Sequence, residues 1–136
     1  AGLMEGATSK TAAHVSCTRF EHAGSSLADL PTIRAYIARM RIKTDQVKAL
    51  IDDTLRALSS GRADAQLRVL ECKAAAGDAA IEVTDLAMRV SGGAAFRKEV
   101  AVERYFRDAR AAAVMGPTSD VLYDFIGKAV CGMPLF

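Results

Sequence analysis

Apolar residues recur along most of the chain at intervals of three and four positions, the spacing that places side chains on one face of an α-helix. Residues 31–59 and 63–90 follow this pattern most regularly. We therefore expect two long helices that pack through their apolar stripes. The first stripe comprises Ile33, Ile37, Met40, Thr44, Val47, Ile51, Leu55 and Leu58, and the second comprises Leu67, Leu70, Ala74, Gly77, Ile81, Thr84 and Met88.

Residues that start or stop helices stand at the predicted ends of these two stretches. Pro31 suits a first helical turn, because its missing backbone N–H would have no partner there in any case. Gly61 can take the left-handed conformation that closes a helix, and Gly92-Gly93 follows the second stretch. Gly77 has no side chain, so a neighbouring backbone can approach the helix closely there. These signals predict where both long helices begin and end.

Three shorter helices are predicted over residues 1–22, 100–113 and 118–130. No stretch shows the signals of a β-strand. The sequence thus predicts an all-α protein, an up-and-down four-helix bundle that forms a single domain over residues 1–136. In the first helix the residues expected on one face are Leu3, Ala7, Ala13 and Cys17.

Composition narrows the classes of function. Hydrophobic residues make up 51% and charged residues 25% of the chain, as in an ordinary folded domain. The net charge is only +2 and the basic residues are scattered among acidic ones, so no nucleic-acid partner is expected. No apolar run could span a bilayer and no signal peptide is recognisable, so we expect a cytoplasmic protein. The three cysteines, Cys17, Cys72 and Cys131, are expected to be reduced and buried or half-buried.

Two segments resemble the C-terminal helical domain of the acyl-CoA dehydrogenase family. In SGGAAFRKEVAVERYFRDARAAAVMGPTSDVL, residues 91–122, a Gly-Gly pair ends a helix, an Arg-Asp-Ala run follows, and a short turn leads into a last helix. In GLMEGATSKTAAHVSCTRFEHAG, residues 2–24, a helix leads to an arginine. The resemblance implies an acyl-CoA substrate, FAD as the cofactor and a homo-oligomer, dimer or tetramer, assembled through this bundle. It also implies a helical domain and a β-domain ahead of this bundle, so the chain is expected to be a C-terminal fragment, with a separately encoded subunit as the alternative. The resemblance does not indicate the electron acceptor.

The resemblance assigns cofactor-binding roles to four residues. Arg19 would hold the flavin dinucleotide's pyrophosphate, commonly that of a neighbouring subunit, since a guanidinium can donate two parallel hydrogen bonds to phosphate. Gly92 and Gly93 would lie toward the adenosine part, and Thr118 would contact the flavin. The residues alone also allow plainer roles: a solvated arginine, a helix cap at the glycines, and an N-cap hydroxyl at Thr118.

The chain offers no catalytic residue where the resemblance would place one. Gly116 occupies the position of the family's usual glutamate base, and Pro117 follows it where relatives carry glycine. Neither can accept a proton. Asp120 is near in sequence, but its helical offset turns its side chain elsewhere. Where many relatives carry glutamine, this chain has Arg89, whose contact is left open.

Three functions remain open from the sequence. The base of a dehydrogenase could lie on a part of the protein that precedes Ala1, as in some relatives. A flavin-dependent monooxygenase of the same fold needs no such base, and a non-catalytic helical subunit that supports assembly needs no flavin. No metal site is predicted, because His14 and His22 alone cannot define one. Two other features are assigned structural roles: Cys72 as a buried thiol, and the Arg107-Asp108 pair as a scaffold link between segments.

Overall fold

The computed structural model describes residues 1–20 and 24–135, which form five α-helices. Two short 3₁₀ helices, η1 and η2, lie between them. Within the described residues there is no β-strand, only one isolated bridge between Arg19 and Ser26. The helices are α1 (Gly2–Cys17), α2 (Pro31–Ser60), α3 (Ala65–Ser91), α4 (Val102–Val114) and α5 (Ser119–Val130), with η1 at Leu27–Asp29 and η2 at Gly92–Phe96.

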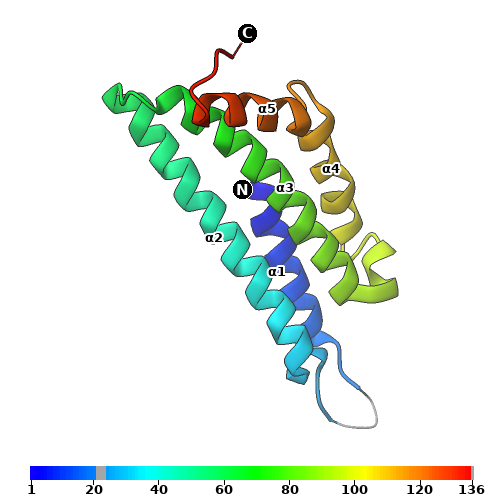
Figure 1. The fold of residues 1–136 in the computed structure, drawn as a ribbon. Helices are drawn as coiled ribbons and strands as arrows, with labels where there is room; N and C mark the ends of the chain where they lie inside the picture. The colour runs from blue at the N-terminus through cyan, green and yellow to red at the C-terminus, as the bar shows by residue number, and fades with distance from the viewer. Residues whose placement is uncertain (21–23, 136) are drawn as a thin grey trace.

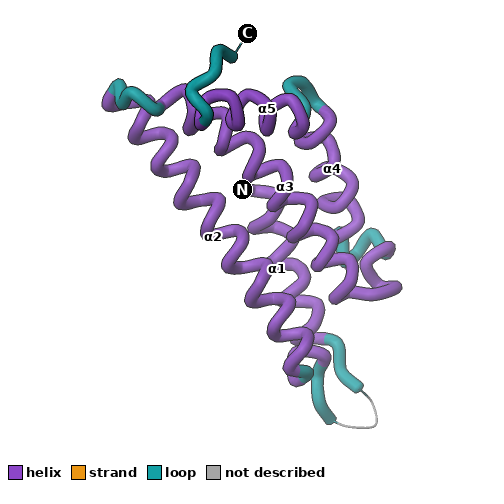
Figure 2. Tube along the Cα trace, in the orientation of Figure 1, coloured by secondary structure: helices purple, strands orange, loops and turns teal. Residues whose placement is uncertain are grey.

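The first four helices run alternately up and down side by side, and α5 crosses one end of α3 (Figures 1 and 2). The predicted all-α, up-and-down bundle is therefore confirmed. Pro31 starts α2 at its first position, and Gly61 closes it with a left-handed φ of 64°. The second long helix begins at Ala65, two residues later than predicted, and ends before Gly92 as expected.

The first helix ends earlier than predicted, at Cys17 rather than near residue 22. Thr18 leaves the helix: its backbone N–H and its hydroxyl both donate to the His14 carbonyl, at 2.9 and 2.8 Å. Phe20 N–H then donates to the Ser25 carbonyl at 2.8 Å. Arg19 consequently lies on a short extended segment instead of a helical turn. His22 lies outside the described residues.

Helix α3 occupies the centre of the bundle and contacts all four other helices. Its buried face is built mostly of small residues, which lets the neighbouring helices approach closely. A Cβ added at Gly77 would lie 3.8 Å from the backbone of Ala112 in α4, which confirms the predicted close approach. The same distance is ordinary van der Waals contact, so alanine would also fit. The buried residues of α3 are Ala74, Gly77, Ala79, Ala80, Val83, Thr84, Ala87, Val90 and Ser91.

The predicted stripe of α2 is buried only in its middle. Met40 and Thr44 are fully buried, whereas Leu55 and Leu58 are 59% and 52% exposed, so the prediction was wrong at that end. At this end of α2 the buried residues are instead Thr54 and Ala57, each one position before one of these leucines, so the buried face is turned by one residue from the predicted stripe. The stripe of α1 is also different from the prediction, since Ala13 and Cys17 are exposed; the buried residues are Met4, Ala7, Thr8, Thr11 and Val15.

The cysteine prediction was wrong at two of three positions. Cys17 and Cys131 are exposed, because one is the last residue of α1 and the other follows the last turn of α5. Cys72 is half-buried, and all three thiols are free. As for the membrane, none of the helices in the described part of the chain is both long and apolar enough to cross a bilayer.

Candidate functional site

Arg19, the predicted phosphate ligand, is exposed on the segment that follows α1. Its charge lies near Asp29, the last residue of η1. The pKa of Asp29 is lowered, mainly because the Ser26 backbone N–H donates to its carboxylate at 2.6 Å and also because Arg34 and Arg19 are close. Arg34 donates to the carbonyls of Ala28 and Asp29, at 3.0 and 2.6 Å. The guanidinium of Arg34 is therefore engaged locally, whereas Arg19 has no hydrogen-bond partner among the described residues.

Gly92 and Gly93 follow α3 directly and are both exposed. Gly92 has φ 56° and ψ −142°, a conformation that side-chain-bearing residues avoid. A Cβ built at either glycine would meet nothing within 4 Å, so their backbone faces open space. Arg89, one turn earlier, lies with its guanidinium 5.3 Å from the centre of the Tyr36 ring, a cation–π contact that ties α3 to α2.

The ends of α1 and α3 lie toward the same end of the bundle (Figure 1). A small hollow of about 300 Å³ brings His14 and Cys17 of α1 beside Glu99 and Val100, which follow η2. In the described part of the chain, neither these residues nor any others form a cluster of metal ligands. We call this end of the bundle, which carries Arg19, Gly92 and Gly93, the Gly-Gly end.

Gly116 and Thr118 lie at the other end of the bundle, where α4 gives way to α5 (Figure 1). Lys73 of α3 holds this junction: its Nζ donates to the Pro117 carbonyl at 2.8 Å and to the Met115 carbonyl at 3.3 Å. The peptide bond between Gly116 and Pro117 is cis. We call this junction the Gly-Pro end.

Thr118 occupies the N-cap position of α5, but its side chain makes no capping hydrogen bond. The neighbouring side chains of α5 bind α3 instead: the Ser119 hydroxyl donates to the Asp78 carboxylate at 3.4 Å, and the Tyr123 hydroxyl donates to the same group. The pKa of Tyr123 is raised, because its phenol loses this bond to the carboxylate when it ionises. The hydroxyl of Thr118 is thus not used as a cap, and α5 is anchored without it.

A pocket of about 520 Å³ adjoins the Gly-Pro end. The residues that line it belong mainly to α1, α3 and α4, and Gly116 is also among them. No carboxylate lines it, and Asp120 is exposed and does not take part. Lys73 is the one lining residue with a charged side chain. The residues that line the pocket are Ala1, Gly2, Leu3, Lys73, Ala76, Gly77, Ala80, Ala112, Met115 and Gly116. The pocket can hold an apolar group but has no general base of its own.

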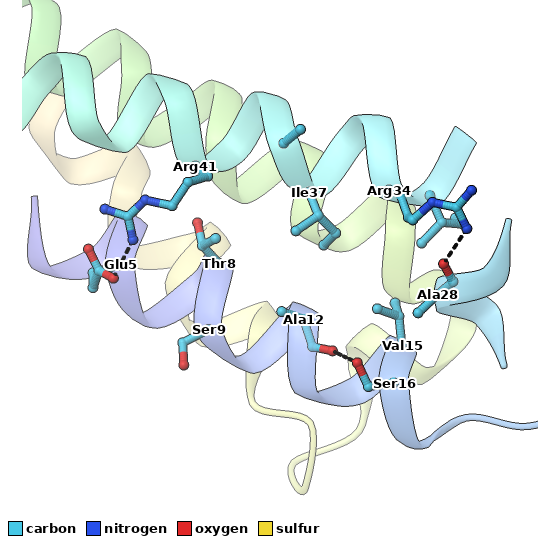
Figure 3. Close-up of a pocket in the computed structure, with 12 residues that line it drawn as sticks. Glu5, Thr8, Ser9, Ala12, Val15, Ser16, Ala28, Arg34, Ile37 and Arg41 are labelled. Atoms are coloured by element: carbon cyan, nitrogen blue, oxygen red, sulfur yellow. Dashed lines mark hydrogen bonds and ion pairs between the residues drawn. The ribbon is translucent and has the colours of Figure 1, made fainter. Parts of the chain in front are cut away.

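A third hollow, a groove of about 580 Å³ between α1 and α2, was not predicted (Figure 3). Its charged side chains are satisfied within the fold: Arg41 pairs with Glu5 at 2.8 Å and with Asp45. The pKa of Glu5 is lowered, first by its hydrogen bond from Lys48 and then by that from Arg41. The floor includes Thr8, whose buried hydroxyl has no partner among the described residues. The signal in the sequence was the series of small residues on α1 opposite Ile33 and Ile37.

The Arg107-Asp108 pair does not link separate segments, so that prediction was wrong. Arg107 donates to its immediate neighbour Asp108 at 3.1 and 3.2 Å, and Asp108 also lies 3.6 Å from Arg104, one turn earlier. All three residues belong to α4. Adjacent positions on a helix face different directions, so the pair stays on the surface of that helix.

Comparison with known proteins decides the family. Residues 1–131 match the family described as "Acyl-CoA dehydrogenase, C-terminal domain". The chain belongs to the acyl-CoA dehydrogenase family. Members of this family are flavoprotein oxidoreductases. The match covers both segments on which the resemblance rested, and it confirms the fold as that of the family's C-terminal helical domain.

One curated protein is similar in sequence, and two solved structures share the fold. The chain is 31% identical to the acryloyl-CoA reductase (NADH) of Anaerotignum propionicum over 95% of its own length and 32% of that enzyme. Among solved structures, a glutaryl-coenzyme A dehydrogenase with glutaryl-CoA matches with a TM-score of 0.89 at 23% identity, over 98% of this chain and 33% of that one. The FAD complex of PigA matches with a TM-score of 0.86 at 16% identity, over 94% and 33%. This chain spans about a third of the length of each.

Proposed function

We propose that this chain is the C-terminal helical domain of an FAD-dependent acyl-CoA dehydrogenase that oxidises a fatty acyl-CoA thioester to the enoyl-CoA. In this proposal it binds part of the flavin and joins subunits into a homo-oligomer, and a helical domain and a β-domain complete each subunit. Family membership and the shared fold support the proposal. The observation that carries it is the apolar pocket at the Gly-Pro end, whose lining includes Gly116, the residue in the position of the family's base.

The pocket supports an acyl substrate through its lining. Leu3, Met115 and the small residues of α3 and α4 offer apolar surface to a hydrocarbon chain. Because Gly116 has no side chain, the proton next to the thioester carbonyl must be taken by a group outside the described residues. The pocket lies beside the first turn of α1, so a base on a neighbouring part of the enzyme could reach it.

The residues predicted to bind FAD suit their roles. Arg19 offers an exposed guanidinium that has no hydrogen bond to any other described residue, and the backbone of Gly92 and Gly93 is open to close approach. The hydroxyl of Thr118 is not used in capping its helix. When bound, FAD supplies the hydride acceptor of the reaction.

The distance between the two ends favours a cofactor site made by two copies of the chain. Lys73 touches the Gly-Pro end, and Gly92 follows the last turn of the same helix. A rise of 1.5 Å per residue along α3 separates the two ends by roughly 28 Å. We propose that Arg19 serves the flavin whose reactive part lies against Thr118 of another copy.

Two other functions compete with this proposal. A flavin-dependent monooxygenase of the same fold is favoured by the pocket's lack of a carboxylate. A non-catalytic assembly subunit would use the helices only for contact with other chains. Neither function explains as directly why Gly116 lines an apolar pocket.

Anaerobic flavin reduction separates these functions. The flavoprotein that contains this chain is mixed with acyl-CoA thioesters of different length while the visible absorbance of the flavin is recorded. A dehydrogenase bleaches the flavin with an acyl-CoA and forms the enoyl product. If acyl-CoA does not bleach the flavin but the reduced flavin consumes oxygen, the protein is a monooxygenase. If the purified protein carries no flavin, it is an assembly subunit.

A further inference from the structure

The charged side chain in the pocket at the Gly-Pro end has no charged partner. The ammonium of Lys73 donates to two neutral backbone carbonyls, those of Pro117 and Met115. No carboxylate of the described residues lies within 4.0 Å of it. Lys43, Lys48 and Lys128 differ in this respect, since each has a carboxylate partner: Glu82, Glu5 and Asp124 respectively. The charge of Lys73 is therefore not neutralised by the fold.

The donors and the surroundings of Lys73 suit an anion. An ammonium has three N–H groups, and the two carbonyls use two of them. The other lining residues are uncharged in their side chains and mostly small. A cation attracts an anion more strongly beside apolar walls than in open water, and hydrogen bonds between charged partners are the stronger ones.

We propose that this pocket selects an acyl thioester whose acyl group ends in a carboxylate, and that Lys73 binds that carboxylate. The inference rests on the proposed function. Lys73 contacts both residues that flank Gly116, the residue in the position of the family's base. The anionic group is therefore placed only a few carbons from the thioester, as in a short dicarboxylic acid.

Lys73 also holds the Gly-Pro end in place, and this second role makes a different prediction. If the side chain acted only as a clamp, its removal would disturb the pocket for every acyl group alike. If it binds a carboxylate, its removal affects anionic acyl groups more than neutral ones. A comparison of two thioesters that differ only in charge therefore separates the roles.

The experiment measures the dissociation constants of succinyl-CoA and butyryl-CoA, which both have four acyl carbons, by calorimetry on the flavoprotein that contains this chain. The variants are Lys73→Met and Lys73→Gln. Lys73→Gln keeps an N–H donor for the Pro117 carbonyl and so removes the charge with less disturbance of the junction. Lys43→Met is the matched control, because it removes the same charge from an ion pair with Glu82 outside this pocket.

We expect the unmodified protein to bind succinyl-CoA about tenfold more tightly than butyryl-CoA, as one charge-assisted hydrogen bond allows. Both Lys73 variants should lose this preference, because they weaken the binding of succinyl-CoA about tenfold more than that of butyryl-CoA, and Lys43→Met should retain it. Equal affinity for both thioesters in the unmodified protein, or an equal loss of both in the variants, would overturn the inference. If butyryl-CoA is bound and oxidised without any preference, only this inference fails; if neither thioester binds, the proposed function fails with it.

Discussion

The Gly-Gly end and the Gly-Pro end of the bundle offer different chemistry. At the Gly-Gly end, Arg19 and the backbone of Gly92 and Gly93 are exposed on the surface. At the Gly-Pro end, Gly116 borders an apolar pocket of about 520 Å³ that contains a single charged side chain. The first end suits the charged, hydrophilic part of a nucleotide, and the second suits an acyl group beside the reactive part of a flavin.

This difference is the basis of the proposal that two copies of the chain share one flavin site. The rigid helix α3 holds the two ends roughly 28 Å apart, at 1.5 Å per residue. Each end supplies one kind of contact and lacks the other. The predictions that follow test the two ends separately, from the largest expected effect to the smallest.

Replacing Arg19 by alanine tests the Gly-Gly end most strongly. We expect FAD to bind the intact flavoprotein at least tenfold more weakly, because a charge-assisted hydrogen bond to phosphate contributes about 1.5–3 kcal/mol. The helical circular dichroism should not change, since Arg19 lies outside every helix. Equilibrium dialysis of the flavin measures the effect, and Arg39→Ala, at an exposed position of α2, is the control. An unchanged dissociation constant for Arg19→Ala would remove the phosphate role from this residue.

Single alanines at the paired glycines separate conformation from contact. Gly92→Ala should lower the free energy of unfolding by about 1–3 kcal/mol, because φ 56° with ψ −142° is strained for any side chain. Gly93→Ala should change it little, since a Cβ there meets nothing within 4 Å. Urea unfolding followed by circular dichroism gives both values. Equal losses at the two positions would contradict the distinct role given to Gly92.

Gly77→Ala tests the pocket at the Gly-Pro end. We expect a gain in stability of up to about 1 kcal/mol, because alanine favours a helix over glycine and the added Cβ lies 3.8 Å from Ala112. Because Gly77 also lines the pocket, the same change should weaken the binding of an acyl-CoA. Gly6→Ala is the matched comparison: its Cβ would lie 2.8 Å from the Tyr105 hydroxyl, so it should be less stable than Gly77→Ala. The reverse order of stability would show that the packing of α4 is described wrongly.

Glu5→Gln concerns the groove between the two ends and should have the smallest effect. The pKa of Glu5 in the folded chain is below its ordinary value of 4.5, chiefly because of Lys48. Its contribution to stability is therefore present above that pH and disappears as the pH falls through the lowered pKa. The urea midpoints of Glu5→Gln and the unmodified chain should differ slightly near pH 7 and converge as the pH falls below the lowered pKa. A difference that persists at the acidic pH would mean that Glu5 acts through packing instead of charge.

Much of the fold was predictable because helix signals are local. Pro31 and Gly61 act within one turn, and they mark the ends of α2 within a residue. The exposure of Leu55 and Leu58 was not predictable, since the spacing of apolar residues does not show that the neighbouring Thr54 and Ala57 face the bundle instead. The early end of α1 depends on Thr18, which competes for the His14 carbonyl with both its N–H and its hydroxyl.

The candidate site was predictable only as a set of separate residues. Family resemblance pointed to Arg19, Gly92, Gly93 and Thr118, but sequence spacing does not place them at opposite ends of a bundle. Lys73 was not identified as a site residue from the sequence. Its partners lie more than forty residues away along the chain, so no local pattern marks it.

The most direct test of a flavin site shared by two copies uses mixed oligomers. Protein with Arg19→Ala and protein with Thr118→Tyr are each expected to retain FAD poorly. When the two are co-expressed with different tags and the mixed oligomers are isolated, some sites combine an unmodified Arg19 from one copy with an unmodified Thr118 from the other. Our account predicts that these mixed oligomers regain tightly bound FAD. Mixed oligomers that retain FAD no better than the parent variants would contradict it, because every site would then lie within a single copy.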